Sequence, residues 1–201
     1  MSLNEDVSSP QRRRGEALEM ALLDAAWAEL TETGYDDLTI EAVATRAGTS
    51  RAVLYRRWPN KQDLVLATLL DHVRSDPVPT PDTGSLRGDV VALLKAANEL
   101  RLRTAILVFT RLGGFYRDAD TNLAELAAVV QGDRATVLDE IIEQAVARGE
   151  VQPGQISDRV ARVPVELFRY ELMVRLQPVP DDVLEEIVDD VFLPLVGIGA
   201  P

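Results

Sequence analysis

The stretch "TIEAVATRAGTSRAVLYRRWP", from Thr39 to Pro59, carries the strongest local structure signals in the chain. Thr39 offers a hydroxyl N-cap to a short helix, and Gly48 closes that helix. Ser50 can cap a second helix, from Arg51 to Trp58, which the following proline ends. Two short helices joined by a tight turn predict a helix-turn-helix, the arrangement whose second helix enters the major groove of DNA.

The charge of this stretch differs from that of the whole chain. The 201 residues carry a formal net charge of −12, which disfavours a nucleic-acid partner because phosphates repel an acidic surface. The segment from Ala42 to Gln62 contains no Asp or Glu and five basic residues: Arg46, Arg51, Arg56, Arg57 and Lys61. Such a run is often only a solvated face, and the charge pattern alone leaves both interpretations equally open.

A recognition helix that begins at Arg51 assigns roles to individual side chains. Arg51 is long enough to reach O6 and N7 of a guanine, and Ala52 is small enough to let the backbone approach. Tyr55, Arg57 and Lys61 are placed for phosphates, whereas Val53, Leu54 and Trp58 are expected to face the core of the domain. The predicted DNA contacts are Thr39, Thr49, Ser50, Arg51, Ala52, Tyr55, Arg56, Arg57 and Lys61. Arg12 to Arg14 precede the first helix and either contact DNA or form a basic tail without a fixed contact.

The remainder of the chain reads as helix, and no stretch alternates with period two for long enough to predict a strand. Three prolines between Ser75 and Gly84 predict a stiff connection. We therefore expect an all-α protein with a DNA-binding domain at 1–74, a connection at 75–84 and a larger helical domain at 85–201. Pro164 predicts a kink or a delayed start in one helix. The expected helices are 13–33, 40–47, 51–58, 61–73, 85–100, 104–116, 121–148, 157–176 and 181–196.

Composition excludes several kinds of site. The chain has no cysteine and a single histidine, His72, which excludes disulfides, thiolate metal sites and multi-histidine metal centres. We predict no cofactor, no metal and no catalytic residue. No apolar run approaches the roughly 18 to 20 residues of a membrane span, and the N-terminus lacks an apolar signal core, so we expect a cytoplasmic protein.

The last expected helix has an apolar stripe wider than a single core contact requires. One edge of this stripe is available for the domain itself and the other for a second subunit, which predicts a two-fold four-helix interface. The alternative is an ordinary buried terminal helix. The predicted dimer contacts are Leu184, Ile187, Val188, Val191 and Leu195.

The segment from Leu38 to Leu70 resembles the DNA-binding signature of the tetracycline-repressor (TetR) family. The shared features are a Thr before the second helix, Ala-Gly-x-Ser at the turn, Leu-Tyr in the recognition helix, an aromatic at its end, and Asn-Lys followed by an acidic residue. Ala52 stands where the family commonly has Gly, and Arg57 where it commonly has His, so no operator sequence is carried over. The matching residues are Thr39, Ala47, Gly48, Ser50, Leu54, Tyr55, Trp58, Asn60, Lys61 and Asp63.

The resemblance implies that the larger domain binds a ligand and forms the homodimer. The aromatic and Met side chains in the helices that would surround the family's cavity lie beside Gly113 and Gly114, which are expected to loosen the packing. Aromatic residues on an apolar face more often belong to a closed core. The predicted pocket residues are Phe109, Phe115, Tyr116, Phe168 and Met173.

Together these features predict a dimeric transcriptional regulator that binds an inverted-repeat operator in double-stranded DNA as a repressor and is released by a small, largely apolar ligand. One rival is a helical-bundle enzyme that uses carboxylates such as Glu166 and Glu171 for acid-base chemistry. Arg162, Arg169 and Arg175 are close enough in sequence to pair with those carboxylates instead. The other rival is a helical interaction protein without DNA binding.

Overall fold

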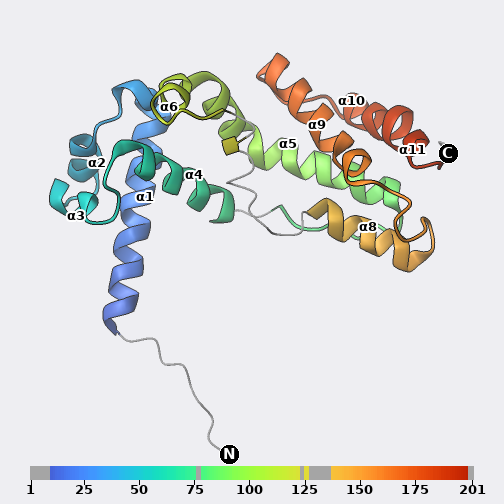
Figure 1. The fold of residues 1–201 in the computed structure, drawn as a ribbon, viewed down its shortest axis with the longest axis horizontal. Coiled ribbons are helices and arrows are strands. Elements are labelled where there is room, and N and C mark those ends of the chain that lie inside the picture. Colours follow the sequence, from blue (N-terminus) through green and yellow to red (C-terminus); the bar gives the residue numbers. More distant parts are fainter. Residues whose placement is uncertain (1–9, 76–77, 123–124, 127–136, 199–201) are drawn as a thin grey trace, which may run out of the picture. The chain divides into compact units, whose positions relative to one another are not determined.

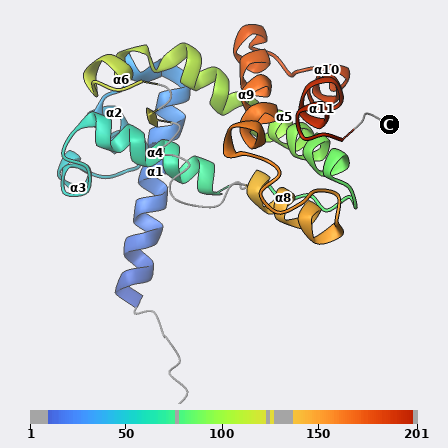
Figure 2. The same cartoon turned by 45° about the vertical axis from the view of Figure 1, so that its right-hand side comes forward.

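The structure, a computed structural model, describes residues 10–75, 78–122, 125–126 and 137–198, with the side chains at 10–14, 101–103, 105 and 108–109 excepted. Every regular element within these ranges is a helix, as Figures 1 and 2 show, so the predicted all-α class is confirmed. The chain divides into two compact units. The first contains α1 to α4 and α6, and the second contains α5, apart from its last residue Arg111, and α8 to α11.

The first unit is built on α1 (Pro10–Asp37), which α4 (Lys61–Ser75) crosses. Gly34 has φ 81° and ψ 175° and interrupts α1, so the predicted helix stop at this glycine is confirmed. The short helices α2 (Ile40–Arg46) and α3 (Arg51–Tyr55) follow, and α6 (Gly113–Asp118) packs on α1 although it comes much later in the sequence. The buried residues of this unit include Leu22, Leu30, Tyr35, Val43, Leu54 and Leu64.

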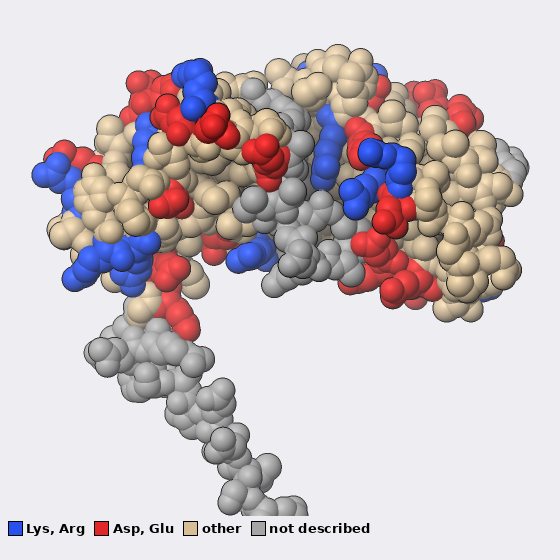
Figure 3. Space-filling view, in the orientation of Figure 1, with Lys and Arg blue, Asp and Glu red and all other residues tan. Residues whose placement is uncertain are grey.

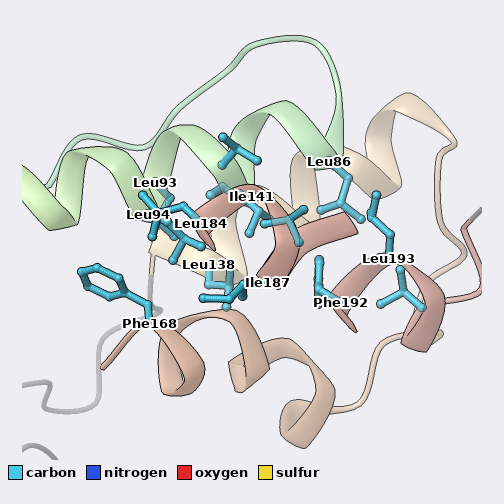
Figure 4. Packing of buried hydrophobic residues seen from close by; sticks show 14 of the residues in the cluster. Leu86, Leu93, Leu94, Leu138, Ile141, Phe168, Leu184, Ile187, Phe192 and Leu193 are labelled. Atoms are coloured by element: carbon cyan, nitrogen blue, oxygen red, sulfur yellow. The ribbon is translucent and has the colours of Figure 1, made fainter. Parts of the chain in front are cut away.

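The second unit packs the apolar faces of its helices into one core. Its helices are α5 (Leu86–Arg111), α8 (Val137–Arg148), α9 (Asp158–Arg175) and a last segment made of α10 (Asp181–Glu186), a π-helical turn η1 (Ile187–Phe192) and α11 (Leu193–Leu195). Leu94, Ile141, Phe168 and Phe192, one from each of these elements, belong to this core and are labelled in Figure 4. Buried Asn98 holds the loop before α10, because its side chain pairs with both the N–H and the carbonyl of Val179 at 3.0 and 2.9 Å.

A buried carboxylate fastens the start of α5. Asp89 is fully buried and accepts hydrogen bonds from the Thr83 backbone and hydroxyl and from Arg148 of α8 at 2.8 Å. Burial alone would raise the pKa of Asp89, but the hydrogen bonds from Thr83 and Arg148 outweigh it, and the pKa lies below its ordinary value. The Asp89 carboxylate therefore stays ionised and holds the segment around Thr83 against the start of α5.

A proline lies two residues after the π-helical turn. Pro194 has no N–H to donate, so the Asp190 carbonyl inside the turn receives no i→i−4 hydrogen bond from it. The Leu193 N–H instead reaches the Val188 carbonyl, five residues back, and the helix continues to Leu195. This keeps Val188, Phe192 and Leu193 buried together.

Two expectations for the helices of the second half of the chain are wrong, and a third lies largely outside the described residues. The break expected between residues 100 and 104 is wrong, because α5 runs unbroken from Leu86 to Arg111, a span whose only glycine or proline is Gly88 near its start. A delayed start of α9 is also wrong: Ser157 caps it and the helix runs through Pro164. The expected helix 121–148 is represented by α8 and by residues 125–126, and the rest of it lies outside the described residues.

Across the described ranges, no helix is both long and apolar enough to cross a membrane. The same ranges contain no group of three or more His, Cys, Asp or Glu side chains placed to hold a metal ion.

Candidate nucleic-acid interface

The turn between α2 and α3 is fixed by its own residues. Thr39 caps α2, and its hydroxyl accepts the Ala42 N–H at 3.1 Å. Gly48 has φ 64°, which a glycine adopts without strain, and lets the Thr49 N–H reach back to the Ala44 carbonyl at 2.9 Å. Ser50 is the N-cap of α3 as predicted, but its hydroxyl makes no capping bond. That hydroxyl is left on the exposed surface.

Two apolar side chains anchor α3 to the rest of the first unit. Leu54 and Trp58 are buried, as predicted, whereas Val53 is only half-buried. The α-helix ends at Tyr55, earlier than the predicted Trp58, and the N–H groups of Arg57 and Trp58 both donate to the Leu54 carbonyl in the turn that follows. Arg56 and Arg57 lie in the turn that continues from the helix.

The predicted DNA contacts fall on one short, continuous stretch of surface. Ser50, Arg51, Ala52, Tyr55 and Arg56 are exposed, and 51% of the Tyr55 side chain is accessible although it is aromatic. Figure 3 shows basic groups over the end of the unit that carries α3, with acidic groups beside them. Thr39 is also exposed, Thr49 and Arg57 are half-buried, and the side chains of Arg12 to Arg14 lie outside the described residues.

Glutamates from α1 and α2 accompany the basic residues, which the sequence pattern did not predict. Arg46 binds both Glu29 and Glu32, at 3.0 and 2.5 Å, and this hydrogen bonding lowers the pKa of Glu32 below its ordinary value. Arg51 pairs with Glu41 at 3.3 Å. Arg57 lies 3.9 Å from Glu19 of α1.

Helical i,i+4 spacing reveals none of these pairs, because each of them joins two separate elements. Glu41 lies one residue before the segment from Ala42 to Gln62 that contains no acid. The local basic charge is thus smaller than the composition of that segment indicates.

Lys61, at the start of α4, is held inside the first unit. Its ammonium donates to the Asp36 carbonyl at 3.1 Å and lies 4.2 Å from the centre of the Tyr35 ring. Burial lowers the pKa of Lys61, while the charges of Asp36, Asp118 and Asp37 oppose that shift. An ammonium carries three donors, so this placement leaves it capacity for a phosphate.

Comparisons with known families agree with this geometry. A family model described as tetracyclin repressor-like, C-terminal domain, matches residues 80–191, more than half of the chain. The model of bacterial regulatory proteins, tetR family, matches residues 22–68, which include the helix-turn-helix. The chain belongs to the TetR family. It is therefore a DNA-binding transcriptional regulator.

Relatives support the assignment over nearly the whole length. An HTH-type transcriptional regulator of Mycobacterium bovis is 35% identical over 180 residues, covering 88% of this chain and 86% of the relative. A DNA-binding transcriptional repressor of Mycobacteroides abscessus is 31% identical over 190 residues, covering 93% and 98%. The crystal structure of a TetR-family regulator from Streptomyces coelicolor has the same fold, with a TM-score of 0.64, 20% identity, and coverage of 90% and 80%.

The predicted pocket residues whose side chains are described belong to different units of the chain. Phe115 and Tyr116 contact each other in the first unit, with ring centroids 5.9 Å apart, whereas Phe168 belongs to the core of the second. Met173 is 41% exposed, and the side chain of Phe109 lies outside the described residues.

The expectation that the glycine pair loosens the packing is wrong for Gly114. A Cβ at this position would clash with the side chain of Asp36 and approach Cδ1 of Tyr35 to 2.8 Å. Gly114 therefore allows α6 to pack closely on the end of α1.

The predicted dimer residues divide into two groups. Leu184, Ile187 and Val188 are buried in the core of their own unit, and their role at a subunit interface stays a prediction. Val191 and Leu195 are exposed, at 37% and 54%.

The carboxylates of the enzyme hypothesis lie next to arginines. Glu171 pairs with Arg175 at 2.8 Å, as predicted, and Glu166 lies 3.6 Å from Arg159. Both pairs lie on the surface of α9, where ion pairs of this kind are common.

Proposed function

We propose that this TetR-family regulator is a repressor that inserts α3 into the major groove of an inverted-repeat operator. The observation that carries the proposal is that Leu54 and Trp58 anchor α3 from within, while Ser50, Arg51 and Tyr55 face outward. In this arrangement Arg51 reads a guanine and Ala52 allows the backbone to approach. The phosphate contacts are Thr39, Thr49, Ser50, Tyr55, Arg56, Arg57 and Lys61.

Repression, rather than activation, is supported by the Mycobacteroides relative, which is a DNA-binding transcriptional repressor and aligns with 93% of this chain. The cytoplasm, which holds the chromosomal DNA, is the compartment in which this function is carried out. The proposal includes a DNA-binding domain at 1–74, a connection at 75–84 and a larger helical domain at 85–201.

The operator is tested by a gel shift with the DNA that flanks the gene of this protein and by selection from a random duplex library. A selected sequence with two inverted half-sites, one helical turn apart or a multiple of it, is the expected result. Selection of no sequence would contradict the proposal.

The proposed homodimer uses exposed apolar side chains of the second unit. Tyr170 and Val174 of α9 are 57% and 61% exposed, and Leu195 lies at the end of the last helical segment, which packs against α9. Large apolar side chains on adjacent helices are costly to leave in water and typical of subunit interfaces. The remaining members of this exposed set are Met173, Leu176 and Val191.

The proposed ligand is small and largely apolar, and it binds among the helices of the second unit. Binding of this ligand can release the protein from the operator only if the ligand binds one arrangement of the recognition helices more tightly than another. A coupling of roughly 1 to 3 kcal/mol would change operator affinity about 5- to 150-fold. A thermal-shift screen of apolar and amphipathic metabolites tests this step, since a ligand at 100 times its Kd adds about 2.7 kcal/mol of stability.

A further inference from the structure

The Arg51 side chain, the proposed base reader, has an acidic neighbour that no DNA-binding role yet explains. Nη1 of Arg51 lies 3.3 Å from Oε2 of Glu41, which joins the first residue of α3 to the second residue of α2. The two side chains are 63% and 71% exposed, so the pair lies on the surface that faces the DNA in the proposed complex.

In water, such an exposed pair contributes little, because solvent and salt screen it. When DNA covers the surface, water leaves and the same contact strengthens. A carboxylate that meets phosphates without a cationic partner is repelled. Glu41 is therefore tolerated at the interface mainly while it remains bound to Arg51.

The geometry of the contact leaves Arg51 able to read a base. A guanidinium has five N–H donors in a planar fork. Glu41 occupies Nη1, so the edge formed by Nε and Nη2 stays available for a bidentate contact with O6 and N7 of guanine. A flexible arginine without this contact samples other rotamers and reaches phosphates as readily as bases.

We propose that Glu41 is a positioning residue that directs Arg51 toward a guanine and lowers the affinity for DNA lacking a guanine at that position. This inference rests on the proposed function, because it requires α3 to enter the major groove. Glu41 itself need not contact the DNA, since it acts through Arg51.

The test uses the full chain and the duplex selected by the wild-type protein. Affinities of the wild type, Glu41→Gln, Arg51→Ala and the double variant are measured for this duplex, for duplexes with each single base-pair change, and for random DNA. Arg51→Ala identifies the base pair that Arg51 reads. Asp24→Asn is the matched control, because it removes one negative charge from α1, and thermal unfolding checks that every variant is folded.

The expected result is specific to one base pair. Glu41→Gln reduces the preference at the Arg51 base pair about three- to tenfold and raises the affinity for random DNA about two- to fivefold. In the Arg51→Ala background it has no further effect on that preference. Glu41→Asp keeps the negative charge on a side chain that is one methylene shorter. Compared with Glu41→Gln, it should return the affinity for random DNA close to the wild-type value but recover less of the preference at the Arg51 base pair.

Two outcomes overturn the inference while leaving the proposed function intact. The preference at the Arg51 base pair is unchanged in Glu41→Gln, or it changes equally with and without Arg51. A wild-type protein that selects no sequence would instead contradict the proposed function, and the inference would fail with it.

Discussion

The hydroxyl of Tyr35 donates a hydrogen bond of 2.9 Å to Oδ2 of Asp118, a residue 83 positions later in the chain. Tyr35 is 1% exposed, packs edge-on against Phe115 of α6, and offers its ring face to the ammonium of Lys61. One side chain at the end of α1 thus contacts both α6 and the first residue of α4. Tyr35 therefore connects α6 with the ammonium that is proposed to bind a phosphate.

Tyr35→Phe should destabilise the protein by about 1 kcal/mol, because the ring keeps its packing while the hydrogen bond is lost and the Asp118 carboxylate loses its donor. Urea unfolding at pH 7 measures the difference. Tyr55→Phe is the control, since that ring is half exposed on α3. Equal unfolding free energies for Tyr35→Phe and the wild type would show that the bond contributes nothing.

Tyr35→Phe should also change how the stability of the protein depends on pH in alkaline solution. Burial, and then the Asp118 carboxylate, raise the pKa of Tyr35 above the ordinary 10.0. The folded state therefore holds this proton more tightly than the unfolded state, so its contribution is complete below pH 10 and is lost as pH rises beyond it. Between pH 9 and 11 the wild type should lose stability more steeply than Tyr35→Phe, as urea titrations will measure.

Lys61→Ala should weaken binding to operator and random DNA alike and reduce the slope of log K against log salt by about one, because one counterion fewer is released. Fluorescence anisotropy over a salt series measures both. Lys95→Ala, which removes a lysine paired with Asp181 and Glu185 in the second unit, serves as the control. A loss confined to one base pair would assign Lys61 a different role.

Leu195→Glu should weaken self-association about 10- to 100-fold without unfolding the chain, because it places a charge on the proposed dimer surface and removes roughly 1.5 to 3 kcal/mol of apolar burial. Val188→Glu should instead unfold the second unit, since Val188 is completely buried. Sedimentation velocity and circular dichroism separate the two effects. A wild-type monomer at micromolar concentration would rule out the dimer.

Asp89→Asn should cost about 2 kcal/mol at pH 7, because Thr83 and Arg148 lose a buried ionised acceptor. The pKa of Asp89 is lowered in the folded state, so its stabilisation is present above about 3.8 and disappears as pH falls through the folded value. The two proteins should therefore converge in stability in strong acid. Asp82→Asn, at an exposed partner of the same arginine, should cost less than about 0.5 kcal/mol.

Local signals made the first unit predictable. Thr39, Gly48 and Pro59 act within a few residues of their own position, and the helix boundaries near them agree with the sequence-based ones to within three residues. The break expected in α5 lacked such a signal, since neither glycine nor proline occurs near residues 100–104.

Contacts between distant elements were beyond prediction from one sequence. The pairs Arg51–Glu41 and Tyr35–Asp118 depend on how separate helices pack, which spacing along the chain does not encode. The last segment illustrates the same limit in another way. Its wide apolar stripe was recognised, but only the packed core shows that Leu184 and Val188 face inward and Leu195 outward.

The π-helical turn from Ile187 to Phe192 is equivalent to one residue inserted into an ordinary α-helix. Each residue of a regular α-helix advances by about 100°, whereas a π-helical turn accommodates one extra residue without passing that rotation on. Deleting one residue within this turn should therefore leave Leu195 on the side of the helix that it now occupies, whereas a deletion beyond Phe192 would turn it by about 100°. The surface offered to a partner at this end is set by helix register, and the π-helical turn is the place where the chain can lose one residue without redirecting it.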